Sequence, residues 1–203
     1  MTYLSKILLP GVVLILLNSA PVVATEDSPS NVVSRFQQLL INTMKVANKT
    51  TVRERYKLLR PGVELSFHLP LMSQIATGRY WKVATQHEQV EVTDAFLRMS
   101  VSTLATLFDG YSGEVFEEKG VRDGPSKTKL VMTELVKTDK SRISIIYVTR
   151  RFKRGWRIID VVVDRGISEM KVRQSEYHQV LKTHGIPGLV TLLNTKADEL
   201  TSR

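Results

Sequence analysis

The chain has 203 residues, with 29 Lys and Arg against 20 Asp and Glu, and a formal net charge of +9. Apolar residues make up 42% and charged residues 24%, which is typical of a folded globular protein and excludes a largely disordered one. The absence of cysteine excludes zinc fingers, iron–sulfur clusters, thiol catalysis and a disulfide framework. Because domains commonly contain about 100–200 residues, we expect one domain with a sizeable core.

The first 24 residues have the pattern of a secretory signal peptide. Lys6 is their only charge, and residues 7–17 are almost wholly apolar. Val22 and Ala24 suit the small-residue positions of a cleavage site, so we predict cleavage after Ala24. The alternative is an uncleaved membrane anchor, but the apolar stretch is shorter than the ~20 residues that span a bilayer.

Apolar residues at three- and four-residue steps then predict helices. The first predicted helix has an apolar face made of Val33, Phe36, Leu40, Met44 and Ala47. Thr51 and Glu54 have the spacing of a capping box, and we expect the helix that they begin to stop at Pro61 and Gly62.

Two more helices are predicted before the pattern changes. Pro70 suits the first turn of a short helix that Gly78 can end. Thr85 and Glu88 form a second capping box at the start of the longest amphipathic helix. The apolar positions of that helix, which ends near residues 109–110, are Val90, Leu97, Val101, Leu104 and Phe108.

The apolar period next changes to two, which predicts strands rich in Val, Ile, Thr and Tyr. The predicted strands are residues 114–118, 129–136, 142–152 and 156–163. Short turns join them, so we expect an antiparallel meander. Residues 143–148 and 158–163 are apolar on both faces, so these central strands are either covered on both sides or turn one face to an internal cavity.

The chain returns to helix from Ile167, with a break at Gly185 and a last helix from Pro187. The order is therefore helices, sheet, helices, with no strand–helix alternation. We predict an α+β fold, in which N- and C-terminal helices wrap a twisted antiparallel sheet of about four strands.

Catalytic motifs are scarce in this sequence. The four histidines have no metal-ligand spacing, and we interpret them as surface or capping residues: His68, His87, His178 and His184. Glu117–Glu118 and Asp160–Asp164 could pair for acid–base work, but charged residues at strand ends and turns are far more often solvated. Asp160 interrupts an apolar strand, so its carboxylate is expected to find donors from an Arg or from backbone N–H groups.

Basic residues crowd the predicted strand region between Lys127 and Lys182. They indicate either a face that meets anionic lipid headgroups or acidic proteins, or a solvated surface. Nucleic acid is not expected as a partner, because an apolar sheet explains the neighbouring Tyr147, Phe152 and Trp156 better than base stacking does.

Three segments together resemble one exported family. They are residues 78–85 followed by a helix with Phe96 and Leu97, residues 156–163 followed by Gly166–Ser168, and residues 173–177 followed by Leu181 and Gly185. In order and spacing they resemble the MlaC family of periplasmic lipid-binding, toluene-tolerance proteins, including its hopanoid-associated HpnM branch. The resemblance extends from about Val32 to Leu200.

The resemblance implies that residues 25–203 form a single lipid-binding domain, NTF2-like, with an apolar cavity between sheet and helices. It implies a periplasmic protein without catalytic activity or cofactor that carries a phospholipid or hopanoid. The sequence does not give the oligomeric state, and we take a monomer as the default. The implied partners are an outer-membrane lipoprotein complex and an inner-membrane ABC transporter with an MCE-domain protein.

Combining the resemblance with the apolar pattern gives a candidate cavity lining, although a packed core would show the same periodicity. The candidate lipid-binding residues are Phe96, Val101, Leu104, Ile143, Ile145, Tyr147, Val161, Val163 and Met170. A large apolar pocket is the usual site for such ligands.

Two departures and two alternatives accompany this interpretation. The family usually has an Asp where His68 stands, and residues 164–168 are closer to the hopanoid branch, so the lipid class stays open.

One alternative is an exported NTF2-like enzyme with Asp160 or His178 as general base in a polar cavity. The other is an adaptor without ligand that binds proteins through the basic face.

Overall fold

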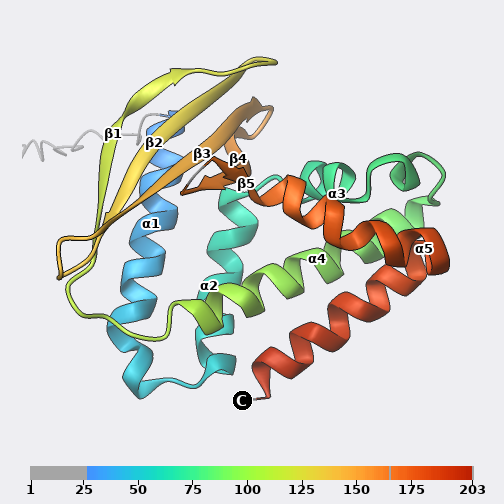
Figure 1. The fold of residues 1–203 in the computed structure, drawn as a ribbon, viewed down its shortest axis with the longest axis horizontal. Coiled ribbons are helices and arrows are strands. Elements are labelled where there is room, and N and C mark those ends of the chain that lie inside the picture. The colour runs from blue at the N-terminus through green and yellow to red at the C-terminus, as the bar shows by residue number, and fades with distance from the viewer. Residues whose placement is uncertain (1–26, 165, 203) are drawn as a thin grey trace, which may run out of the picture.

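The structure is a computed structural model that describes residues 27–164 and 166–202, in which one antiparallel sheet lies beside a group of helices (Figure 1). The helices of this part of the chain are α1 (Pro29–Val46), η1 (Ala47–Lys49), α2 (Val52–Ser66), α3 (Leu69–Thr77), η2 (Gly78–Lys82), α4 (Gln86–Leu107) and α5 (Glu169–Thr201). The strands are β1 (Val115–Asp123), β2 (Thr128–Val136), β3 (Arg142–Phe152), β4 (Gly155–Val163) and β5 (Ile167–Ser168). The predicted α+β class is confirmed, while the predicted signal peptide lies outside the described residues.

Both predicted capping boxes are present. The Thr51 hydroxyl accepts from the N–H of Glu54 at 3.2 Å, and the Glu54 carboxylate accepts from the N–H of Thr51 at 2.8 Å. Thr85 and Glu88 make the same pair of bonds, also at 3.2 and 2.8 Å. These reciprocal bonds satisfy N–H groups that have no partner inside the helix, and they fix where α2 and α4 begin.

The expected stop of α2 at Pro61 and Gly62 is wrong, because the helix continues to Ser66. Gly62 lies against α1, where an added Cβ would come within 2.2 Å of Cδ2 of Leu39. The missing side chain lets α1 and α2 pack closely. This tertiary contact outweighs the local preference of Pro and Gly against a helix interior.

Gly62→Val is expected to lower the free energy of unfolding by about 1–3 kcal/mol, the usual cost of overpacking. The branched side chain would force Leu39 away and separate α1 from α2. Urea unfolding measures the effect, and Lys57→Val, on the exposed side of the same helix, shows the cost of a β-branched residue in α2 without a clash. Because Val has a higher helix propensity than Gly, a Gly62→Val protein at least as stable as the wild type would show that the close approach of the helices contributes nothing.

The sheet has five strands in the order β1-β2-β3-β4-β5, and every neighbouring pair is antiparallel. The fifth strand, Ile167–Ser168, pairs with Val162 and Val163, where a helix was expected. The helix begins two residues later, because the Ser168 hydroxyl caps α5 by accepting from the N–H of Lys171 at 3.1 Å.

Helices pack on one face of the sheet (Figure 1). α1 lies against the strands, α4 runs below them, and α5 folds back alongside α4. The turn in α5 is at Gly185, whose φ of 63° is non-helical, so the predicted break before Pro187 is confirmed. Among the described residues, no helix is both long and apolar enough to span a bilayer.

Candidate functional site

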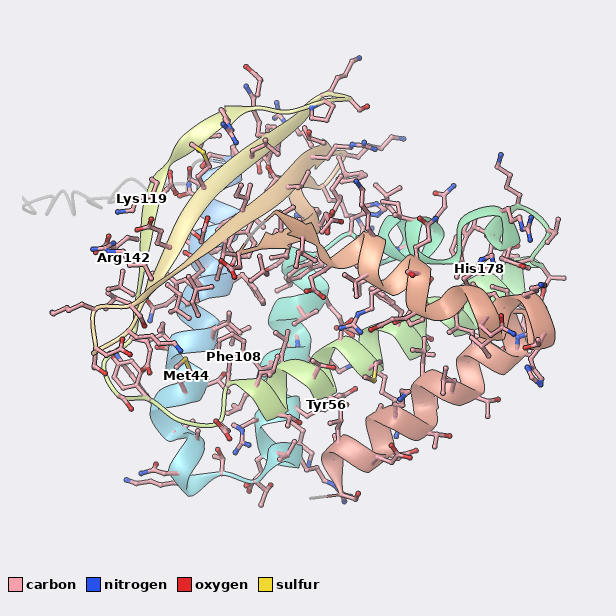
Figure 2. The ribbon with its side chains drawn as sticks, in the orientation of Figure 1. Met44, Tyr56, Phe108, Lys119, Arg142 and His178 are labelled. Carbon is pink, nitrogen blue, oxygen red and sulfur yellow. The ribbon has the colours of Figure 1, made fainter. Side chains whose placement is uncertain are left out.

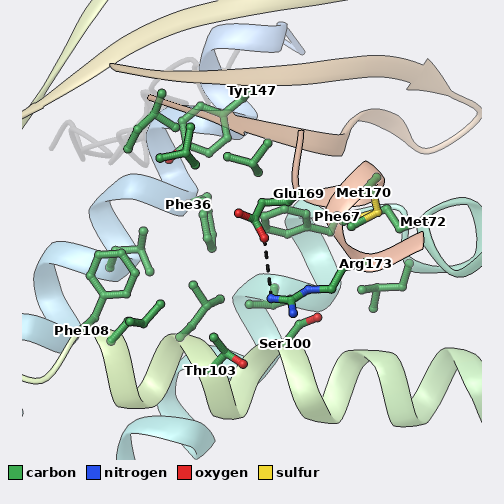
Figure 3. Close-up of a pocket in the computed structure, with 18 of the residues that line it drawn as sticks. Phe36, Phe67, Met72, Ser100, Thr103, Phe108, Tyr147, Glu169, Met170 and Arg173 are labelled. Carbon is green, nitrogen blue, oxygen red and sulfur yellow. Dashed lines mark ion pairs between the residues drawn. The ribbon is translucent and has the colours of Figure 1, made fainter. Parts of the chain in front are cut away.

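A cavity of about 490 Å³ lies between the sheet and the helices (Figure 3). Its volume falls within the roughly 300–1,000 Å³ usual for ligand pockets. Most of its lining is apolar. The side chains that line it are Phe36, Leu40, Val63, Phe67, Leu69, Met72, Phe96, Ser100, Thr103, Leu104, Leu107, Phe108, Leu135, Ile143, Ile145, Tyr147, Val161, Val163, Glu169, Met170 and Arg173.

Strands β3 and β4, together with Leu135 of β2, supply the wall on the sheet side. Ile143, Ile145 and Tyr147 alternate along β3, and Val161 and Val163 alternate along β4, so all five point to the same face. Tyr147 is paired with Val161 and Ile145 with Val163 across the two strands. The sequence left open whether these strands are covered on both faces or turn one face to a cavity, and the structure favours the second.

Eight of the nine residues predicted from the sequence lie along this cavity, namely Phe96, Leu104, Ile143, Ile145, Tyr147, Val161, Val163 and Met170. Val101 does not. It is 0% exposed and shares a row of α4 with the buried Leu97 and Ala105. One residue beyond the lining Ser100, it is turned by about 100° around the helix axis. Whether the eight bind lipid stays a prediction.

Aromatic residues from other elements complete the apolar wall, and sequence reasoning missed them. Phe36 of α1 meets Phe67 edge to face, with ring centroids 4.8 Å apart, and Tyr147 at 6.2 Å. Phe36 was already on the apolar face of the first predicted helix, so its burial could be predicted. Its contact with a cavity could not, because Phe67 and Tyr147 come from distant parts of the chain.

Tyr147 keeps the sheet side of the cavity uncharged. Burial raises the pKa of its hydroxyl to about 12, although a hydrogen bond with Gln37 acts in the opposite direction. Gln37 in turn donates to the Thr133 hydroxyl at 3.1 Å, and Thr133 donates to the carbonyl of Ile145 at 3.0 Å. These buried polar groups thus satisfy one another.

Two charged residues also line the cavity, and sequence reasoning missed both. Glu169 and Arg173 stand one turn apart at the start of α5, with Arg173 Nη2 3.6 Å from Glu169 Oε2 (Figure 3). Arg173 Nη1 donates to Glu176 at 2.8 Å. Burial acts to lower the pKa of Arg173, but Tyr177, Glu176 and Glu169 outweigh it, so the pKa is raised and the side chain keeps its charge.

His68 caps α3. Its Nδ1 accepts from the N–H of Leu71 at 3.2 Å, and its ring stacks on Phe152 with centroids 3.9 Å apart. Burial lowers the pKa of His68, and the charges of Arg157 and Arg150 lower it further. The neutral imidazole therefore satisfies one of the N–H groups that have no partner inside α3.

The lowered pKa of His68 predicts a loss of stability in acid. As the pH falls below about 6.5, the unfolded chain takes up the proton first, so the free energy of unfolding decreases until the folded pKa is passed. His68→Asn retains a side chain that can cap the helix but does not titrate, so its stability should fall less between pH 7.5 and 5.5. Urea unfolding at both pH values tests this, and an equal fall in the two proteins would refute it.

The two residues proposed as general bases lie elsewhere. Asp160 accepts from the N–H groups of Val161 at 2.8 Å and Met170 at 3.1 Å, and from the Ser168 hydroxyl at 2.5 Å. It thus ties β4 to the start of α5, with the donors that were expected of it. His178 is exposed and borders a separate hollow of about 300 Å³. Within residues 27–164 and 166–202, acidic and His side chains form no group of three or more that could hold a metal ion.

The opposite face of the sheet carries an ion-pair network. Arg142 donates to Glu117 at 2.8 Å and to Glu134 at 2.7 Å, and Lys119 lies 2.8 Å from Glu117. Figure 2 shows Lys119 and Arg142 beside each other at the sheet. Hydrogen bonds from Lys119 and Arg142 lower the pKa of Glu117 to about 2. Part of the basic charge in the strand region is therefore neutralised locally.

Comparison with known proteins agrees with this architecture. A phospholipid-binding protein from Ralstonia solanacearum, solved in complex with a phospholipid, superposes with a TM-score of 0.71 at 17% sequence identity, covering 84% of this chain and 95% of that one. An identity this low shows the fold alone. A comparison with curated proteins gives no match. The sequence matches the family described as MlaC protein over residues 31–195, and the chain therefore belongs to the MlaC family.

Proposed function

We propose that this protein is a periplasmic lipid carrier that holds the acyl chains of a phospholipid in the cavity between sheet and helices. The observation that carries the proposal is the cavity of about 490 Å³ with its predominantly apolar lining. Membership of the MlaC family supports it, as does the phospholipid found in the R. solanacearum neighbour.

The physical chemistry of such a cavity suits carriage rather than catalysis. Each methylene group withdrawn from water contributes about 0.8 kcal/mol, so an acyl chain of ~16 carbons would contribute on the order of 10 kcal/mol. Spontaneous release into water would then be slow. Delivery needs a partner that opens the cavity or accepts the chains directly.

We further propose that the carrier is the soluble component of an ABC-type lipid transport system. Its partners would be an outer-membrane lipoprotein complex and an inner-membrane transporter with an MCE-domain protein. This assignment extends the family membership, and the predicted cleavage after Ala24 would place the mature chain in the compartment between those membranes.

Lipid uptake by the purified protein tests the proposal. Delipidated protein is incubated with phospholipid vesicles, separated from them by centrifugation, and analysed for phosphorus. We expect close to one phospholipid per chain. Protein that returns free of lipid from this incubation would contradict the proposed function.

A further inference from the structure

The charged residues of the cavity lining stand at its edge rather than in its depth. Side-chain exposure is 40% for Glu169 and 27% for Arg173, while Tyr147 across the cavity is 2% exposed. Leu107, which also lines the cavity, is 68% exposed. A lipid whose acyl chains fill the apolar part would therefore place its headgroup beside Glu169 and Arg173.

Arg173 Nη1 is bonded to Glu176, but Arg173 Nη2, the Glu169 carboxylate and the Ser100 hydroxyl can meet a ligand at this edge. The 3.6 Å between Arg173 Nη2 and Glu169 Oε2 is too long for a hydrogen bond, so the pair is a loose one. The hydroxyl of Ser100, which faces the same cavity from α4, makes no hydrogen bond with any other described residue. Figure 3 shows Arg173 extending from α5 toward Ser100.

The charge balance at this edge indicates which headgroup fits. Arg173 pairs with both Glu169 and Glu176, so one positive charge stands against two negative ones. A headgroup with net negative charge adds another negative charge to this group. A zwitterionic headgroup instead brings a phosphate for the guanidinium of Arg173 and an ammonium for the carboxylate of Glu169.

On the basis of the proposed function, we propose that Glu169 and Arg173 select phospholipids with zwitterionic, amine-bearing headgroups. Arg173 Nη2 and the Ser100 hydroxyl donate to the phosphate oxygens. The Glu169 carboxylate accepts from the ammonium group. A primary ammonium can donate hydrogen bonds that a quaternary one cannot, so phosphatidylethanolamine fits best, phosphatidylcholine less well and phosphatidylglycerol least.

A competition between headgroups tests this selection. Delipidated protein is incubated with vesicles of equal parts phosphatidylethanolamine, phosphatidylcholine and phosphatidylglycerol with identical acyl chains, and the bound lipid is extracted and identified by mass spectrometry. The wild type should be enriched about threefold to fivefold in phosphatidylethanolamine over phosphatidylglycerol, the range of one partly exposed ion pair. Glu169→Gln should remove most of this enrichment, and Glu169→Lys should reverse it.

The total amount of bound lipid tests the carrier function, and its headgroup composition tests the selection by Glu169 and Arg173. Lys171→Gln, an exposed change on the same helix, should leave both unchanged. Bound lipid in the proportions of the vesicle, in wild type and Glu169→Lys alike, would overturn the selection and leave the carrier function standing. Protein without any bound lipid would refute the carrier function itself.

Discussion

Val161→Trp is expected to weaken lipid binding more than tenfold while the protein stays folded. Val161 lies on β4 opposite Tyr147, and its side chain lines the cavity. An indole there occupies space that acyl chains would fill. Displacing two or three methylenes at about 0.8 kcal/mol each costs roughly 2 kcal/mol, which is more than tenfold in affinity. Ile145→Asp should have the same effect through a charge placed among apolar walls.

The sheet offers a matched control one residue away. Val162 is half-buried like Val161, but it points to the opposite face, where it pairs with Ile146. Val162→Trp should therefore retain wild-type lipid. Phosphorus per protein after incubation with vesicles gives the result, and circular dichroism confirms the fold. A folded Val161→Trp protein with wild-type lipid content would show that this cavity does not hold the ligand.

Arg55→Met is expected to give the largest loss of stability among single polar changes. Arg55 of α2 is 6% exposed, and its guanidinium donates to three backbone carbonyls, those of Ala105 at 2.8 Å, Thr50 at 2.7 Å and Ala47 at 3.3 Å. Methionine fills similar space but removes the donors to the carbonyls of Ala105 and Thr50, while the carbonyl of Ala47 still accepts from the N–H of Thr50 at 3.3 Å. We expect the free energy of unfolding to fall by about 3 kcal/mol, since a buried acceptor left unsatisfied costs about 1–3 kcal/mol.

Arg55→Met should also disturb the cavity. Arg55 holds the carbonyl of Ala105, and Ala105 belongs to the end of α4 that carries the lining residues Leu104 and Leu107. Arg53→Met, on the exposed side of α2, is the control and should change stability by less than about 0.5 kcal/mol. Urea unfolding compares the two. Similar stabilities would show that the three carbonyl contacts of Arg55 contribute little.

Local signals in the sequence were sufficient for much of the fold. The capping boxes at Thr51 and Thr85 depend on residues three apart, and the break at Gly185 depends on a φ that glycine adopts readily. The continuation of α2 through Gly62 could not be predicted from such local signals. It depends on contact with Leu39 in another helix, and no local pattern records that contact.

The residues that line the cavity could be predicted well on the strands and less well on the helices. A strand has two faces, so the alternation of Ile143, Ile145 and Tyr147 assigned all three to the same wall. α4 packs against neighbours on several sides, so its apolar periodicity could not separate Val101 in the core from Leu104 in the cavity. Arg173 belongs to the family-like segment 173–177, but its place in the cavity was not predicted, because a charged residue in an amphipathic helix is ordinarily solvated.

The lipid content of the protein after purification without detergent tests the carrier function. The chain is expressed with its N-terminal segment, recovered from the periplasmic fraction and measured intact by native mass spectrometry, and its lipid is then extracted and identified. We expect close to one phospholipid per chain, with phosphatidylethanolamine enriched relative to the membrane. A hopanoid in its place would overturn the assignment of the ligand, and protein that carries no lipid at all would contradict the carrier function.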